Sequence, residues 1–253
     1  MPPLSASRLV VAALAALVAG VVNAVAGGGT LLTFPALIAA GLSPLLANAT
    51  STVALWPGSL ASGWGYRREV LAERKSALEL SLVSAVGGVA GALLLVWTPA
   101  DVFLRLLPFL LLAATLLFTF GPRIREVLGA RSGEETGRGT VLVLQAVIAV
   151  YGGYFGGGMG LMMLAAFALM GMTDIHRMNG LKSLMGALIN GVAVVTFIVA
   201  KVVDWTIVLP MVVGAIAGGY LGATVARRLP GAYVRRFVIA VGWAMTVAFF
   251  VRG

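Results

Sequence analysis

The sequence lacks cysteine altogether and contains a single histidine among its 253 residues. Without cysteine, neither a disulfide framework nor a thiol-based mechanism is available. The histidine, His176, stands beside Arg177 in a predicted loop, which favours a solvated side chain over a proton relay. Metal-ligating residues form no cluster along the sequence, so we expect no metal and no other cofactor.

Charge is also scarce. Charged residues make up 11% of the chain, whereas hydrophobic residues make up 60% and the mean hydropathy is +1.02. This composition predicts an all-α integral membrane protein that crosses the lipid bilayer several times. The apolar segments behind this prediction are residues 8–26, 30–41, 48–65, 76–97, 102–120, 139–155, 158–171, 178–200, 205–226 and 231–252. Most reach the ~20 residues that cross the hydrocarbon, but 30–41 and 158–171 are short.

The first apolar segment also has features of a cleaved signal peptide, because Arg8 precedes an alanine-rich core and "AVA" stands at 24–26. The equivalent segment of the second half, residues 139–155, lies deep within the chain, where no signal peptide could lie. We therefore interpret residues 8–26 as a membrane span.

The formal net charge of +9 would suggest a nucleic-acid partner if the protein were soluble. Here the basic residues cluster in short segments between apolar spans, as the positive-inside rule describes for cytoplasmic loops. We therefore expect no nucleic-acid partner, and the composition leaves a homo-oligomer open.

Internal repetition divides the chain into two homologous halves. The motif "VGGVAGALL" at 86–94 matches "AGGYLGATV" at 217–225, and a run of three glycines occurs both at 27–29 and at 156–158. We predict a first transmembrane repeat over residues 1–120, a polar cytoplasmic linker over 121–138 and a second transmembrane repeat over 139–253.

The distribution of basic residues predicts that the two halves face opposite ways. Residues 66–76 are basic, whereas the next turn, 98–101, contains no Lys or Arg. In the second half the basic loop is the other one of the pair. Residues 201–205, the counterpart of 66–76, carry one Lys, whereas residues 227–236, the counterpart of 98–101, carry four Arg. Counting the short segments as crossings gives an inverted 5+5 repeat of ten segments with both termini outside, an architecture common in secondary transporters. The alternative is a parallel 4+4 repeat with re-entrant short segments, which leaves one basic loop outside.

The two glycine runs interrupt otherwise apolar sequence, and each is followed by a short segment. A helix that restarts after such a run exposes backbone N–H groups and the positive end of its dipole, both of which favour an anion. Within a membrane, free backbone groups are tolerated only where protein or a water-lined cavity meets them. We therefore predict one shared substrate cavity, with candidate residues Gly27, Gly28, Gly29, Thr30, Gly156, Gly157 and Gly158. The glycines of the 86–94 and 217–225 motifs we interpret as helix-packing residues.

A second polar group opens the third span of each half. It comprises Asn48, Thr50 and Ser51 in the first half and Asn179 and Lys182 in the second. Asn179 and Lys182 share a helical face. A lysine just inside a span either snorkels to the interface or faces a polar cavity, and both interpretations stay open. Amides, hydroxyls and one cation suit an oxyanion, because they donate hydrogen bonds without presenting a competing carboxylate.

Acidic residues number only nine, and they lie in predicted loops or at span edges, apart from Glu79. Glu79 follows Lys75 by one turn, so we expect it to form an ion pair near the interface. A dedicated intramembrane carboxylate for proton or sodium coupling is therefore not evident.

The segments "VNAVAGGGTLLTFPALIAAGLSPLLANATS" and "YGGYFGGGMGLMMLAAFALMGMTDIHRMNGLK" resemble the two repeats of the TauE/SafE family of sulfite exporters and related anion permeases. The likeness covers nearly the whole chain. It implies secondary transport of sulfite, sulfonates or related sulfur-containing anions across the bacterial inner membrane, with the matched glycine and polar positions along the translocation pathway. The second copy lacks the proline equivalent to Pro35 and the Thr-Ser pair, so we expect the halves to contribute unequally.

The leading hypothesis is therefore a transporter of a small anionic substrate, with no enzymatic activity and no catalytic residues. The nearest alternatives are an anion channel and a transporter of another small organic anion. An intramembrane enzyme would have only Ser or Thr with Lys182 as nucleophile and base. A primary pump is disfavoured because the chain has no "GxxxxGK[ST]" phosphate loop.

Overall fold

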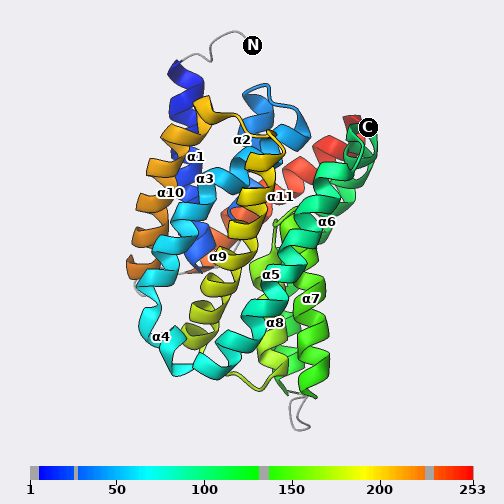
Figure 1. Ribbon diagram of the computed structural model, residues 1–253. Coiled ribbons are helices and arrows are strands. Elements are labelled where there is room, and N and C mark those ends of the chain that lie inside the picture. Colours follow the sequence, from blue (N-terminus) through cyan, green and yellow to red (C-terminus); the bar gives the residue numbers. More distant parts are fainter. Residues whose placement is uncertain (1–5, 26–27, 131–136, 226–230, 253) are drawn as a thin grey trace.

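The computed structural model describes residues 6–25, 28–130, 137–225 and 231–252, and it is helical along almost all of them. The helices pack as one bundle (Figure 1). They are α1 (Ala6–Val25), α2 (Thr30–Ala39), α3 (Pro44–Gly65), α4 (Arg67–Ala72), α5 (Arg74–Trp97), α6 (Ala100–Ala130), α7 (Arg138–Tyr154), α8 (Met159–Leu169), α9 (Ile175–Val199), α10 (Trp205–Val225) and α11 (Gly231–Arg252).

Three of the described helices are long and apolar enough to cross a membrane, namely Ser76–Trp97 in α5, Ile175–Val199 in α9 and Trp205–Gly222 in α10. Shorter apolar stretches occur in α1, α2, α8 and α11. This result agrees with the expected all-α membrane protein, and the two shortest of these helices, α2 and α8, are those that follow the glycine runs.

Helix contacts repeat between the two halves of the chain. Helices α1 and α3 of the first half both pack on α10 of the second half. Helices α7 and α9 of the second half both pack on α5 of the first half. The short helix α2 contacts α3 and α11, and α8 correspondingly contacts α9 and α6. Two further contacts, α3 with α9 and α6 with α11, join equivalent helices to each other.

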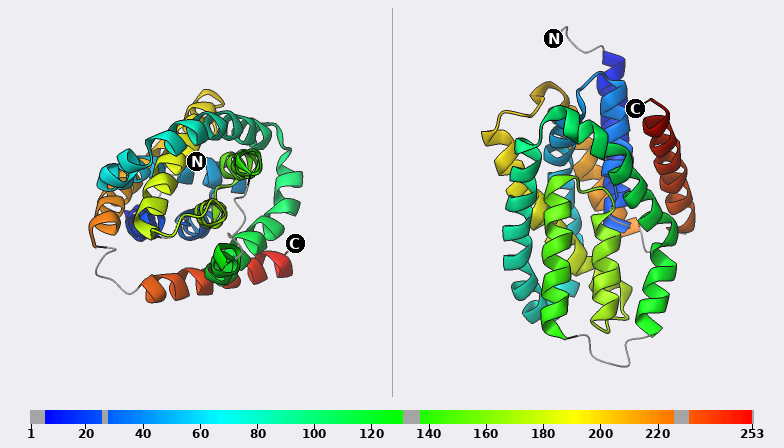
Figure 2. Two further views of the ribbon diagram at one scale, coloured as in Figure 1. Left: turned by 90° about the horizontal axis from the view of Figure 1, so that it is seen from below. Right: turned by 90° about the vertical axis from the view of Figure 1, so that its right-hand side faces the viewer.

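Helices α1 and α3 run in the opposite direction to α7 and α9. In Figure 1, α1 and α3 run from the upper end towards the lower end, whereas α7 and α9 start at the lower end and run upwards. The start of α1 and the end of α11 lie at the upper end, while α4 and the start of α7 lie at the lower end; Figure 2 gives two further views of the same arrangement. The basic residues of α4 and of the starts of α7 and α9 therefore share one end of the bundle.

Two segments differ from the sequence-based expectation. The helix α6 continues to Ala130, so it includes ten residues that we had assigned to the polar linker. The stretch "RIREVL" that follows Pro122 contains the good helix formers Arg, Glu and Leu, and polarity alone does not end a helix. The short helix α4 was not expected, and it lies between α3 and α5. The linker residues 131–136 lie outside the described part of the chain.

The start of α9 is capped by an acidic side chain. The Asp174 carboxylate accepts hydrogen bonds from the backbone N–H groups of His176, at 2.8 Å, and Arg177, at 3.4 Å. The bond from His176 is the main reason why the pKa of Asp174 lies below its usual range. Arg177 also pairs with Glu73, with 3.1 Å between Nη1 and Oε1, which links the start of α9 to the α4–α5 junction.

The glycines of the repeated motifs allow close helix contacts, as predicted. A Cβ atom on Gly218 of α10 would lie 2.0 Å from the carbonyl oxygen of Leu17 in α1. A Cβ atom on Gly91 of α5 would lie equally close to the carbonyl oxygen of Val150 in α7. Small residues at such crossings let two backbones approach, which is how membrane helices commonly associate.

We expect Gly218→Ala to destabilise the protein by about 1–3 kcal/mol, because the added methyl group would separate α10 from α1. The matched control is Gly63→Ala in α3, where a Cβ atom would meet nothing within 4 Å. That substitution should be neutral or stabilising by up to ~1 kcal/mol, since alanine is the better helix former. Thermal denaturation of the detergent-purified variants measures both, and equal stability of the two would contradict the close-packing interpretation.

Candidate functional site

The first glycine break joins α1 to α2 and is held by a side-chain amide. Asn23 Oδ1 accepts a hydrogen bond from the N–H group of Gly29 at 2.7 Å. A Cβ atom on Gly29 would lie 2.5 Å from the carbonyl oxygen of Ala19, so this position has no room for a side chain. The carbonyl groups of Gly28 and Gly29 then accept the first bonds of α2. Gly27 lies outside the described residues.

The second break joins α7 to α8 and has a different local structure. Gly156 and Gly158 have φ angles of +76° and +79°, which glycine adopts at little cost. The hydroxyl group of Tyr151 donates to the carbonyl oxygen of Gly157 at 2.6 Å. Within the described chain, no acceptor is found for the N–H groups of Gly157 and Gly158. The start of α8 therefore presents open donors and the positive end of the helix dipole.

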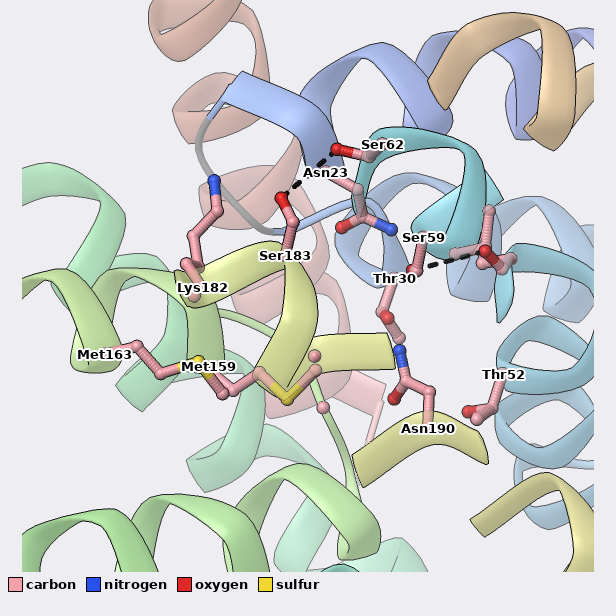
Figure 3. A pocket seen from close by; sticks show the side chains of 14 residues that line it. Asn23, Thr30, Thr52, Ser59, Ser62, Met159, Met163, Lys182, Ser183 and Asn190 are labelled. Carbon is pink, nitrogen blue, oxygen red and sulfur yellow. Dashed lines mark hydrogen bonds between the residues drawn. The ribbon is translucent and has the colours of Figure 1, made fainter. Parts of the chain in front are cut away.

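The two breaks meet at one cavity of about 40 Å³ (Figure 3). A Cβ atom on Gly156 would lie 3.9 Å from Thr30 Oγ1, which shows how close the two breaks are. Residues from α1, α2, α3, α8 and α9 and from the second break line the cavity: Asn23, Thr30, Thr52, Leu55, Ser59, Ser62, Gly156, Met159, Gly160, Met163, Lys182, Ser183, Gly186 and Asn190. The predicted shared cavity is thus present.

Hydroxyl and amide groups make up much of the cavity wall. Ser62 of α3 and Ser183 of α9 face each other with their Oγ atoms 3.2 Å apart. Thr52 lies three turns earlier on α3, and its hydroxyl donates to the carbonyl oxygen of Asn48 at 3.0 Å. The Asn190 side chain points towards Thr30 in Figure 3. Donors from both halves of the chain therefore surround the same space.

Lys182 is the cationic residue of the cavity. Its side chain is only 3% exposed, and its Nζ atom donates to the carbonyl oxygen of Ala24, next to the first glycine break, at 3.2 Å. None of the ion pairs in the described structure involves it. Lys182 therefore lines the cavity with its side chain buried, which favours the cavity interpretation over snorkelling.

The structure brings only part of the predicted site together. Thr30, Gly156 and Lys182 line the cavity, whereas Gly28, Gly29, Gly157 and Gly158 shape the two breaks beside it. Four predicted residues lie outside the lining: Asn48, Thr50, Ser51 and Asn179.

Three of these four form hydrogen bonds to other segments of the chain. Asn48 Nδ2 donates to the carbonyl oxygen of Tyr154 at 3.0 Å, and Thr50 Oγ1 accepts from the N–H group of Asp204 at 3.0 Å. Ser51 Oγ lies 2.5 Å from Thr33 Oγ1, which joins α3 to α2. Their positions on α3 explain why they do not line the cavity. Thr50 and Ser51 lie about 200° and 100° around the helix axis from Thr52, so they face other directions, and Asn48 lies one turn before Thr52 along the helix.

Asn179 lies one turn before Lys182 on α9. Its side chain is buried, and its Oδ1 atom has no hydrogen-bond partner in the described structure. Asn179 therefore does not line the cavity, and its Oδ1 atom is buried without a hydrogen bond in the described structure.

Several lining residues were not among the sequence candidates, although their spacing carries a signal. On α3, residues 52, 55, 59 and 62 recur at helical spacing and share one face. On α8, which follows Gly156, the residues Met159, Gly160 and Met163 likewise recur at helical spacing and share one face. Asn23 stands just before the first glycine run, where an amide is a natural partner for a free backbone N–H group. These signals are visible only once the facing helices are known.

The helical bundle of the described residues and its apolar helices indicate a multi-pass membrane protein, and the bundle contains a polar cavity. The family profile described as "Sulfite exporter TauE/SafE" matches residues 12–249. The chain therefore belongs to the sulfite exporter TauE/SafE family, and it is a membrane transporter. The earlier resemblance to this family is confirmed.

Relatives support the same class. The chain is 30% identical over 232 residues to the "Probable membrane transporter protein YfcA" of Escherichia coli (strain K12), covering 91% of this chain and 85% of the relative. It is 31% identical over 239 residues to the "Probable membrane transporter protein ORF9" of Sinorhizobium sp, covering 92% and 88%. A "Probable membrane transporter protein" of Haemophilus influenzae is 27% identical over 236 residues, covering 90% and 89%. These names indicate transport rather than enzymatic activity. No solved structure matches the chain.

We expect Asn23→Ala to destabilise the protein by about 1 kcal/mol, because the N–H group of Gly29 would lose its acceptor inside the bundle. Asn190→Ala is the matched control, since it removes another cavity amide that makes no hydrogen bond in the described structure. Thermal denaturation in detergent measures the difference. An unchanged melting temperature for Asn23→Ala would show that the first break does not depend on this bond.

Proposed function

We propose that the protein is a secondary transporter that moves sulfite, a sulfonate or a related sulfur-containing anion across the bacterial inner membrane. The observation that carries this proposal is the cavity where both glycine breaks meet the buried cation Lys182. Substrate sites at broken helices near the contact of two repeats are a recurring feature of secondary transporters.

The chemistry of the cavity wall supports an anion. Lys182 supplies an amine, and Thr30 and the serines supply hydroxyl donors. Charge-assisted hydrogen bonds of this kind are stronger than neutral ones, particularly where water is scarce. A buried cation with only a carbonyl partner is costly, and a bound anion would offset that cost.

The acidic residues also support an anion, because no Asp or Glu is among the residues that line the cavity. Glu79, which had seemed the nearest to a span interior, forms an ion pair with Arg138 at the start of α7. This ion pair agrees with the interfacial pairing expected for Glu79; the side chain of Lys75, the expected partner, lies outside the described part of the structure. A carboxylate within the site would have repelled the substrate.

Cavity size favours a small anion in the present conformation. About 40 Å³ corresponds to roughly three water-sized groups. That space suits an ion such as sulfite better than a sulfonate with a long alkyl chain, which would require the helices around the cavity to separate.

We further propose that the two halves form an inverted repeat of five segments each, with the short helices α2 and α8 as equivalent elements. The reciprocal contacts of α1 with α10 and of α7 with α5 support this relation. The opposite directions of α1 and α7, and of α3 and α9, support inversion over a parallel 4+4 repeat. By the positive-inside rule, the end that carries α4 and the start of α7 is cytoplasmic.

Alternating access requires contacts between the halves to open in turn at each end. At the end that carries α4, the first half contacts α9, where a Cβ atom on Gly180 would lie 3.1 Å from the Cβ atom of Glu69. Towards the other end, Asn48 bonds the carbonyl group of Tyr154, and Thr50 bonds the backbone of Asp204. These are contacts that would have to separate for the cavity to open in turn at each end.

We expect Lys182→Met to retain or increase thermal stability but to lose the response to sulfite. Removing a buried, poorly paired cation relieves its desolvation cost, whereas the anion loses a charged bond that is typically worth about 1.5–3 kcal/mol, or at least roughly tenfold in affinity. The measurement is the shift in melting temperature with sulfite against chloride at equal ionic strength. Lys201→Met, at an exposed lysine, is the control. A wild-type sulfite response in Lys182→Met would remove the proposed site.

A disulfide between residues 69 and 180 tests alternating access. The chain contains no cysteine, so Glu69→Cys with Gly180→Cys introduces a single defined pair. The Cβ separation is slightly below the ~3.5–4.5 Å of disulfides, so a small backbone shift suffices. We expect the oxidised double variant to stop sulfite flux into liposomes and dithiothreitol to restore it. The single-cysteine variants under the same oxidant are the controls, and undiminished flux through the cross-linked protein would favour a channel.

A further inference from the structure

The cavity has two chemically different walls. The hydroxyl and amide groups described above form a donor-rich wall. The other wall includes Met159 and Met163, which lie one turn apart on α8, and Lys182 lies on their side of the cavity in Figure 3. Figure 3 places the two methionines on one side of the cavity and Thr30, Ser59 and Asn190 on the other. A thioether is polarisable and only a weak hydrogen-bond acceptor, and it donates no hydrogen bond.

The methionines are held firmly in this position. Met163 is completely buried, and Met159 is 9% exposed. A Cβ atom on Gly152 of α7 would lie 2.6 Å from Met159 Sδ, and a Cβ atom on Gly186 of α9 would lie 3.7 Å from Met159 Cε. Two glycines on neighbouring helices thus leave the space that the Met159 thioether fills. This wall is therefore a fixed part of the cavity and not a flexible side chain that could swing away.

We propose that Met159 and Met163 determine specificity, selecting sulfur oxyanions that have one soft or apolar face over anions with oxygen on every side. This inference rests on the anion site proposed above. Sulfate has four equivalent oxygen atoms, so in this cavity one of them faces thioethers that cannot donate to it. A desolvated oxygen without a donor weakens binding. The sulfur lone pair of sulfite, the terminal sulfur of thiosulfate and the carbon of a sulfonate lose no hydrogen bond against the same wall.

Sulfate and thiosulfate form a matched pair of probes, because they share charge and tetrahedral shape and differ by one sulfur in place of one oxygen. The experiment titrates each into the purified full-length protein at constant ionic strength and follows the melting temperature. We expect the wild type to prefer thiosulfate by roughly tenfold, the factor that one unmet hydrogen bond commonly represents. Equal affinities, with both dependent on Lys182, would overturn this inference and leave the anion site standing.

Variants at the methionine wall then test the cause. Met163→Gln supplies an N–H donor on a side chain of similar length. Sulfate should therefore bind more tightly, and the ratio of thiosulfate to sulfate affinity should fall towards one. Met163→Leu removes the sulfur but adds no donor, so it should still reject sulfate. The control is Met162→Gln, which changes the neighbouring residue on α8, outside the cavity lining. Because Met163 is fully buried, Met159→Gln is the second variant if Met163→Gln does not fold.

An unchanged preference in a folded glutamine variant at either position would overturn the proposal. Failure of the wild type to bind sulfite, thiosulfate or sulfate at all would instead overturn the proposed function, and the inference with it. A preference for thiosulfate that Met163→Gln abolishes and Met162→Gln retains would support both.

Discussion

Within a membrane every backbone polar group needs a partner, and this constraint governs the structure around the two glycine breaks. Each break interrupts a helix and frees N–H and carbonyl groups that lipid cannot satisfy. Asn23 satisfies the N–H group of Gly29, and the hydroxyl group of Tyr151 satisfies the carbonyl group of Gly157. In the described part of the chain, the N–H groups of Gly157 and Gly158, just before α8, have no acceptor. The breaks can therefore persist only where protein or a polar ligand meets them, which is why the site lies where the breaks meet.

The helix contacts are nearly symmetric, but the site is not. Close glycine contacts join α10 to α1 and α5 to α7 in the same way, so each half packs against the helix that precedes the break of the other. Lys182 has no charged counterpart in the first half, because the residues 129 and 131 positions earlier, the offsets of the glycine runs and of the packing motifs, are Val53 and Ser51. A second buried cation would add a large desolvation cost. The asymmetry of the cavity is therefore consistent with electrostatics.

Hydropathy and glycine placement predicted an all-helical membrane protein with a short helix after each glycine run, because these features depend on the residue types along a single segment. The repeated glycine runs also pointed to a cavity where the two breaks lie close together. The exact lining depended on helical phase and on which faces meet. Thr50 and Ser51 looked as suitable as Thr52, yet only Thr52 faces the cavity, because the others bond Asp204 and Thr33. Ser59 and Ser62 repeat the spacing of Thr52 on α3, but that face becomes identifiable only when α9 lies opposite. The continuation of α6 to Ala130 was missed because polarity was taken as the end of a helix.

Lys182 connects the stability of the protein to its proposed substrate. A structural ion pair would neutralise the lysine permanently, and the carboxylate would then compete with any incoming anion. In the described structure the Nζ atom donates to the carbonyl group of Ala24, which accepts a hydrogen bond but carries no negative charge. The same carbonyl group lies at the end of α1, immediately before the first break, where a positive charge on Lys182 would also interact favourably with the helix dipole. Burial makes such a charge costly, so the proposed anion would both stabilise the protonated lysine and be held by it.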